Sequence, residues 1–110
     1  MEFATEKIGD ITVVNLPTDV LDASNTEEFK TAIAPVIEKN KKILFEMSKV
    51  KFIDSSGCGV LLSCLRQLNG LGGTLKLCGV QESIRTLFDL VRMHRIIEVF
   101  DTKKEAVKSF

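Results

Sequence analysis

The middle of the chain changes from an extended apolar segment to a helix within ten residues, Phe52-Ile53-Asp54-Ser55-Ser56-Gly57-Cys58-Gly59-Val60-Leu61. The helix is predicted by apolar residues that recur with a 3.6-residue period, namely Val60, Leu61, Cys64, Leu65 and Leu68. Glycines at positions 70, 72 and 73 are expected to end it. In parallel α/β sheets, turns from a strand into a helix are preferred places for ligand and reaction sites. The segment around Asp54 is therefore the candidate site.

Upstream of this segment, the sequence predicts a hairpin, a helix and a buried strand. Strands are expected at residues 2–8 and 11–16 around a Gly9-Asp10 turn, followed by an amphipathic helix over 24–39. The apolar run at 43–47 is typical of a strand buried on both faces. After it, the apolar side chains are expected to point inward again at Val50, Phe52 and Ile53.

Downstream, the pattern predicts two further strands and two further helices. The strands are expected at 74–78 and 96–100, with Leu75 and Leu77 on one face of the first. One helix is marked by Ile84, Leu87, Phe88 and Val91, and the last begins at Thr102 with the spacing of a capping box. The order ββαβαβαβα predicts one α/β domain over residues 1–110. Its sheet is mostly parallel, begins with an N-terminal hairpin and is covered by helices.

Composition and charge exclude several classes of protein. The 110 residues carry a formal net charge of zero, which argues against a dedicated nucleic-acid binder and against an electrostatic membrane anchor. The three cysteines form no CxxC pair, and the one histidine cannot supply a metal cluster, so neither a disulfide framework nor a metal site is expected. The densest apolar run, at 59–65, is too short to span a bilayer. These features predict a cytoplasmic protein without cofactors.

Several roles are open to the Asp54-Ser55-Ser56-Gly57 segment. Asp54 or Ser55 can act only as the N-cap of the helix. A phosphate on a serine there would meet the free backbone N–H groups of the helix N-terminus. Glycines at 57 and 59 would leave the first turn bare, so that a partner could approach the backbone closely. A nucleophilic serine would need a base, but His94 lies in a basic Met-His-Arg context, where we expect a solvated loop. Since there is also no G-x-S-x-G elbow and no P-loop, no enzyme is predicted.

The segment at 52–61 resembles the signature of the STAS domain, and in particular that of bacterial anti-sigma factor antagonists. The family pattern is an apolar pair, then Asp-Ser-Ser/Thr-Gly, then Leu-Gly. Further similarity is carried by Leu21-Asp22, by Gly72-Gly73-Thr74-Leu75-Lys76-Leu77 and by Leu87-Phe88-Asp89-Leu90. The resemblance therefore covers nearly the whole chain.

The resemblance implies a phosphorylation switch. Ser55 would be the acceptor and Ser56 the secondary candidate, with a partner interface that consists of Asp22, Asp54, Ser55, Ser56, Gly57 and Cys58. The unphosphorylated form would bind an anti-sigma factor that is also a serine kinase, the phosphorylated form would be released, and a serine phosphatase would reset the cycle. Transcription would be regulated indirectly, without contact to nucleic acid. Asp22 is open to two roles, as a cap of the first helix or as a contact to the partner.

Two other functions compete with this one. A STAS-type accessory subunit would dock on the ATPase of a membrane transport complex whatever the state of Ser55. A small serine hydrolase is the third alternative.

Three departures from the family pattern stand out. The usual Gly-Glu before Leu-Asp is Asp19-Val20, which changes a loop that would face the partner. Cys58 replaces a common leucine and is expected to pack as a small hydrophobic side chain. Near Val91-Arg92 the glycine that often follows the Leu-Phe-Asp helix is missing, so the helix end lacks its usual left-handed cap residue.

Overall fold

A five-stranded, mostly parallel sheet forms the centre of the protein. The computed structural model describes residues 1–110, and its strand order is β1-β2-β4-β6-β7. The first pair is antiparallel and the other three pairs are parallel, which confirms the predicted hairpin and the predicted α/β class. The strands are β1 Ala4–Ile8, β2 Ile11–Asn15, β4 Lys42–Glu46, β6 Thr74–Cys78 and β7 Glu98–Phe100.

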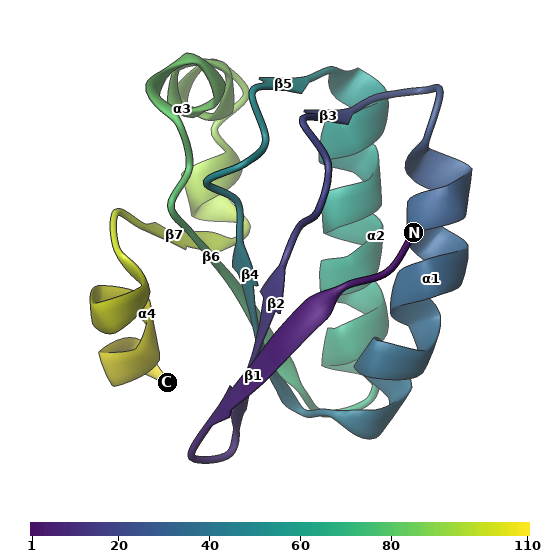
Figure 1. Ribbon diagram of the computed structural model, residues 1–110. Coiled ribbons are helices and arrows are strands. Elements are labelled where there is room, and N and C mark those ends of the chain that lie inside the picture. The colour runs from purple at the N-terminus through teal and green to yellow at the C-terminus, as the bar shows by residue number, and fades with distance from the viewer.

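Helices cover both faces of this sheet, because each parallel connection must cross over it (Figure 1). Two long helices, α1 and α2, lie side by side on one face, whereas the short α4 packs against β4, β6 and β7 on the other. α3 and a 3₁₀ turn, η1, connect β6 to β7. The helical elements are α1 Thr26–Lys39, α2 Ser55–Gly70, α3 Glu82–Leu90, η1 Met93–Arg95 and α4 Lys103–Ser109.

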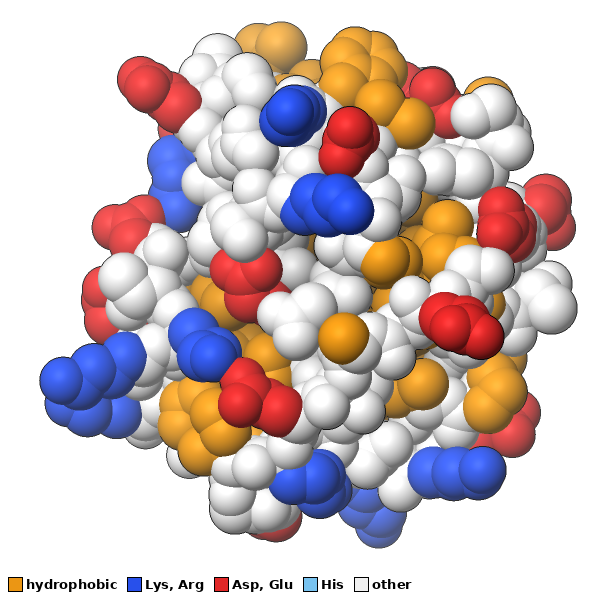
Figure 2. Space-filling view, in the orientation of Figure 1, with side chains coloured by type: hydrophobic (Ala, Val, Ile, Leu, Met, Phe, Trp, Pro, Cys, Tyr) orange, Lys and Arg blue, Asp and Glu red, His pale blue; other side chains and the backbone are white.

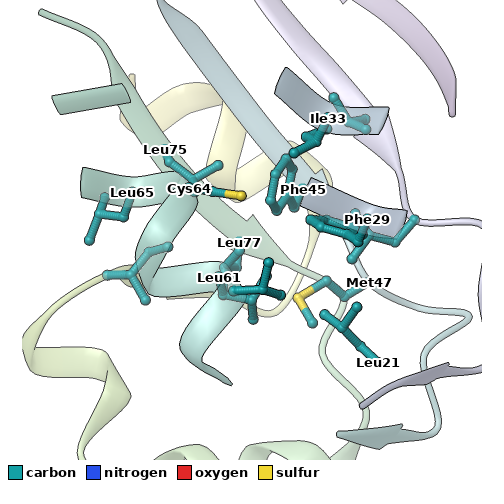
Figure 3. Packing of buried hydrophobic residues seen from close by; sticks show 14 of the residues in the cluster. Leu21, Phe29, Ile33, Phe45, Met47, Leu61, Cys64, Leu65, Leu75 and Leu77 are labelled. Carbon is teal, nitrogen blue, oxygen red and sulfur yellow. The ribbon is translucent and has the colours of Figure 1, made fainter. Parts of the chain in front are cut away.

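The main core lies between the sheet and helices α1 and α2 (Figure 3). Phe29 of α1 meets Phe45 of β4 edge to face, with ring centroids 6.0 Å apart. Leu61 of α2 and Leu77 of β6 are fully buried in the same cluster, as the 3.6-residue and two-residue periods predict. Burial of each such side chain contributes about 2 kcal/mol, so this cluster is the main determinant of the position of α2 on the sheet.

The opposite face of the sheet holds a smaller cluster around a buried lysine. Lys76 of β6 alternates with Leu75 and Leu77 and is only 5% exposed. Its ammonium group donates to the carbonyl oxygen of Ser109 at 2.8 Å and lies 4.7 Å from the centre of the Phe110 ring. This cation therefore packs beneath the last turn of α4, whose C-terminal carbonyl groups favour a positive charge.

A second, two-stranded sheet was not predicted. β3 (Val20–Leu21) and β5 (Phe52–Ile53) pair in parallel next to the N-terminus of α2. The expectation that the apolar side chains of Val50, Phe52 and Ile53 all point inward is wrong at one position. Val50 and Ile53 are buried, whereas Phe52 is 54% exposed, because successive side chains of a strand point to opposite faces.

Predicted and observed boundaries differ at several element ends. α1 begins at Thr26 rather than at residue 24, because Asn25 has a non-helical φ of −134°. The strand expected at 96–100 contains only Glu98–Phe100. Its first two residues instead close a helical turn, in which the backbone N–H groups of Ile96 and Ile97 both donate to the carbonyl of Met93.

Candidate functional site

Asp54 caps α2 and also connects that helix to the loop before α1. Its backbone is extended, and one carboxylate oxygen accepts a hydrogen bond from the N–H of Gly57 at 2.9 Å. The other oxygen accepts from the N–H of Ala23 at 3.3 Å. Of the two candidate caps, the structure therefore selects Asp54 and makes Ser55 the first residue of the helix.

Ser55 and Ser56 are exposed on the first turn of α2. Neither hydroxyl takes part in a hydrogen bond within the chain, and the first helical hydrogen bond is donated by Cys58 to the Asp54 carbonyl. The N–H groups of Ser55 and Ser56 are thus free at the positive end of the helix dipole. A modifying enzyme can reach both hydroxyls, and a phosphate on either would find backbone donors close by.

Gly57 has an internal role that differs from the expected one. It is buried, and a β-carbon at this position would lie 2.1 Å from the carbonyl oxygen of Leu21 and 2.4 Å from Cγ1 of Ile53. Only glycine lets α2 approach β3 and β5 so closely. The prediction of a bare first turn is therefore wrong for Gly57 and holds for Gly59, where a β-carbon would meet nothing within 4 Å.

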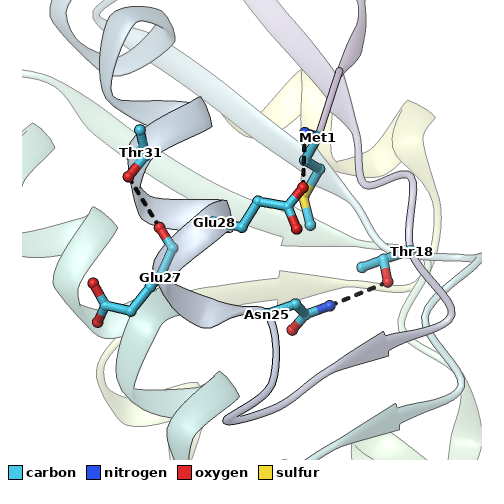
Figure 4. Close-up of polar contacts among 6 residues, drawn as sticks. All are labelled: Met1, Thr18, Asn25, Glu27, Glu28 and Thr31. Atoms are coloured by element: carbon cyan, nitrogen blue, oxygen red, sulfur yellow. Dashed lines mark hydrogen bonds and ion pairs between the residues drawn. The ribbon is translucent and has the colours of Figure 1, made fainter.

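The loop before α1 is held in shape by its own side chains. The Asp22 carboxylate accepts a hydrogen bond from the N–H of Ser24 at 3.0 Å and bonds to no N–H of α1, so it does not cap that helix. The side-chain amide of Asn25 instead donates to the Thr18 hydroxyl at 3.3 Å (Figure 4). It also donates to the Val20 carbonyl at 2.8 Å. These bonds fix this loop, called the Asp22 loop below, next to Asp54, where the loop meets the first turn of α2.

The first turn of α1 carries a favourable arrangement of charges. Glu27 and Glu28 lie near the positive end of its dipole, and the N-terminal ammonium group of Met1 forms an ion pair with Glu28 at 2.9 Å (Figure 4). This contact connects the N-terminus to the helix that follows the Asp22 loop.

A hollow of about 270 Å³ lies beside Ser55, between α2 and the segment α3–η1. Sequence reasoning missed it, since three separate segments form its wall. We call it the Ser55 hollow; it is lined by Ser55, Cys58, Gly59, Leu62, Leu87, Val91, Met93 and Ile96. Burial raises the pKa of the half-buried Cys58 thiol, and the nearby Asp54 carboxylate raises it further. Cys58 is therefore a protonated, mostly apolar part of the wall, which agrees with its expected packing role.

Three other kinds of site considered from the sequence were a functional histidine, a metal site and a membrane span. His94 is exposed in η1, as expected for a solvated basic loop. No three His, Cys, Asp or Glu side chains are arranged to hold a metal ion. No helix combines the length and the apolar character needed to cross a bilayer. On the face shown in Figure 2, acidic and basic side chains are interspersed, in keeping with the zero net charge.

The region that contains Asp54, Ser55 and the Asp22 loop lies within the part of the chain that matches a known protein family. The family model of the STAS domain matches residues 2–106. The chain belongs to the STAS family. A Thermotoga maritima protein named as a candidate anti-sigma factor antagonist is 30% identical to this STAS protein over 104 residues, covering 93% of this chain and 92% of the relative.

Solved structures agree with this assignment. A crystal structure of a candidate anti-sigma factor antagonist from Thermotoga maritima has a TM-score of 0.88 and 27% identity, covering 97% of this chain and 92% of the other. The anti-sigma factor antagonist SpoIIAA in its unphosphorylated form has a TM-score of 0.68 and 23% identity, covering 97% and 94%. At that identity the SpoIIAA comparison supports the fold alone.

Proposed function

We propose that this STAS protein is an anti-sigma factor antagonist controlled by phosphorylation of Ser55. Its unphosphorylated form binds an anti-sigma factor with serine kinase activity, phosphorylation of Ser55 releases it, and a serine phosphatase restores the binding form. The observation that carries this proposal is the exposure of Ser55 at the first position of α2, directly after the capping residue Asp54.

The charge change at Ser55 accounts for both states. A phosphate adds about −1.5 to −2 charges at neutral pH. In the free protein, the N–H groups at the start of α2 and the surrounding water stabilise this charge, so the fold is retained. In a complex the same charge would be desolvated next to the Asp54 carboxylate, which repels it. The complex is therefore weakened much more than the free protein.

The proposed interface surrounds Ser55. Ser56 and Cys58 share the first turn of α2 with it, and Asp54 connects that turn to the loop that contains Asp22. Gly57 belongs to this region as the buried residue that permits the close packing, and not as a surface that a partner touches. The loop at 19–20, where the family pattern is not followed, flanks the same region and would help to determine which anti-sigma factor is bound.

The test is a phosphorylation assay with serine kinases of the anti-sigma type from the source organism. The protein is incubated with each kinase and ATP, and the modified residue is mapped by mass spectrometry, with Ser55→Ala and Ser56→Ala as a matched pair of variants. We expect phosphate at residue 55, lost in Ser55→Ala and retained in Ser56→Ala. If no kinase binds or modifies the unaltered protein, the proposal fails.

A second measurement separates this switch from an accessory subunit of a transport complex. If the protein is a switch, Ser55→Asp strongly weakens its binding to the partner. If it is a constitutive accessory subunit, the affinity for the partner stays the same after this substitution. The relative with 30% identity is named for anti-sigma factor antagonism, which favours the switch. The function proposed is thus binding and not catalysis, and a lack of covalent labelling of Ser55 by a fluorophosphonate is expected.

A further inference from the structure

The Ser55 hollow has the size and lining of a receptor for one apolar side chain. Its volume of about 270 Å³ lies below the roughly 300 to 1,000 Å³ that is usual for small-molecule sites. Six of its eight lining residues are hydrophobic, and Val91 and Ile96 at its edge remain 49% and 55% exposed. Exposed apolar side chains around a concave surface are typical of a protein interaction site.

The segment that borders the hollow is positively charged. Between the lining residues Val91 and Ile96 lie the exposed Arg92 and Arg95, with Asp89 and Glu98 just outside this segment and Asp54 near Cys58 on the α2 side of the hollow. The only arginine that forms an ion pair within the chain is Arg85, so the guanidinium groups of Arg92 and Arg95 are available to a partner. Such groups bind carboxylates in a bidentate geometry.

Arg92 also has an unfavourable backbone conformation. It is the only non-glycine residue with a positive φ, 57°, and it directly follows the C-cap of α3. Glycine would adopt this left-handed conformation without the steric cost that a side chain brings. A side chain kept at a strained position beside a hollow points to a function for that side chain.

We propose that the Ser55 hollow receives one branched aliphatic or aromatic side chain from an acidic segment of the anti-sigma factor, and that Arg92 and Arg95 bind carboxylates of the same segment. This inference rests on the proposed function and specifies the partner's chemistry. Ser55 lies in the wall of the hollow, so a phosphate there would repel those carboxylates and compete with them for the guanidinium groups. Release on phosphorylation then has a second physical cause besides the repulsion between the phosphate and the Asp54 carboxylate.

Two glycines of α2 offer a matched test, since a β-carbon at Gly59 or Gly70 would meet nothing within 4 Å. Gly59→Leu adds a large side chain at the wall of the hollow, whereas Gly70→Leu adds the same side chain at the other end of the helix. Binding of the unphosphorylated protein to the kinase that modifies Ser55 is measured by isothermal titration calorimetry. We expect Gly59→Leu to raise the Kd by about 30-fold and Gly70→Leu to leave it within about twofold.

Arg92→Gly tests the charged part of the proposal without loss of folding. This variant relieves the left-handed strain, so its Tm should rise, while its Kd for the kinase should increase by about tenfold. Arg66→Ala, which removes an exposed and unpaired arginine of α2 outside the hollow, serves as the charge control.

Any other result of these binding measurements contradicts the inference. A Kd unchanged by Gly59→Leu or by Arg92→Gly overturns it while leaving the phosphorylation switch intact, because the unaltered protein would still bind its kinase. Failure of the unaltered protein to bind any kinase overturns both. If sedimentation shows a dimer that Gly59→Leu dissociates, the hollow is occupied by a second copy of this chain and the acidic-segment proposal is wrong.

Discussion

Replacement of Gly57 by alanine should destabilise the protein through one steric contact. The added β-carbon would lie 2.1 Å from the Leu21 carbonyl oxygen, in a region where β3, β5 and α2 meet. This oxygen belongs to the backbone, so either β3 or the start of α2 would have to move by roughly 1 Å to restore an ordinary contact. Overpacking of this kind costs about 3 kcal/mol, and the better helix propensity of alanine recovers about 1 kcal/mol. The expected net loss is about 2 kcal/mol.

Urea unfolding followed by circular dichroism measures this loss, and a thermal melt should show a Tm about 10 °C lower. Gly59→Ala is the matched control, because it makes the same substitution two residues later, where a β-carbon meets nothing within 4 Å. It should stabilise the protein by about 0.5 to 1 kcal/mol. Equal stability of Gly57→Ala and the unaltered protein, or an equal loss in both variants, would refute the reasoning.

Three further predictions concern Asp54, the buried lysine and the cysteines. Asp54→Ala removes the cap of α2 together with the bond to the preceding loop and should cost about 1 to 2 kcal/mol in urea unfolding, whereas Asp54→Asn should retain most of the cap. Lys76→Met keeps the volume and removes a buried charge, so its unfolding free energy should fall by less than about 1 kcal/mol, while Lys76→Ala should lose more than about 2 kcal/mol. Burial raises the pKa of both Cys64 and Cys78 to about 12, so neither thiol ionises at pH 8 in the folded protein. Iodoacetamide should therefore modify Cys58 first, as peptide mass spectrometry would show; earlier labelling of Cys64 or Cys78 would contradict their burial.

The sequence predicted the main elements of this fold because their signals are periodic. The 3.6-residue spacing in α2 and the alternation around Leu75 and Leu77 follow directly from which side chains are buried. β3 and β5 could not be found in this way, since a strand of two residues contains no period. Their pairing depends on contacts between segments about 30 residues apart in the sequence.

The site was predictable in part. Local chemistry marked Asp54 as a candidate cap of a helix at this point, and the structure confirms it. The packing role of Gly57 was misread, because the atoms it contacts come from Leu21 and Ile53, and no local pattern identifies such a neighbour. The Ser55 hollow was missed for the same reason, as its wall combines α2 with α3 and η1. At Arg92 the left-handed conformation persists although glycine is absent, a strain that only the backbone angles reveal.

The two hydrogen bonds of Asp54 have a consequence for the kinetics of association. One carboxylate keeps the start of α2 and the loop at Ala23 in a fixed mutual position before any partner arrives. An incoming protein thus meets a surface that is already assembled, and little conformational entropy remains to be lost on docking. Recognition should therefore proceed without a slow folding step, at a rate governed by diffusion and orientation.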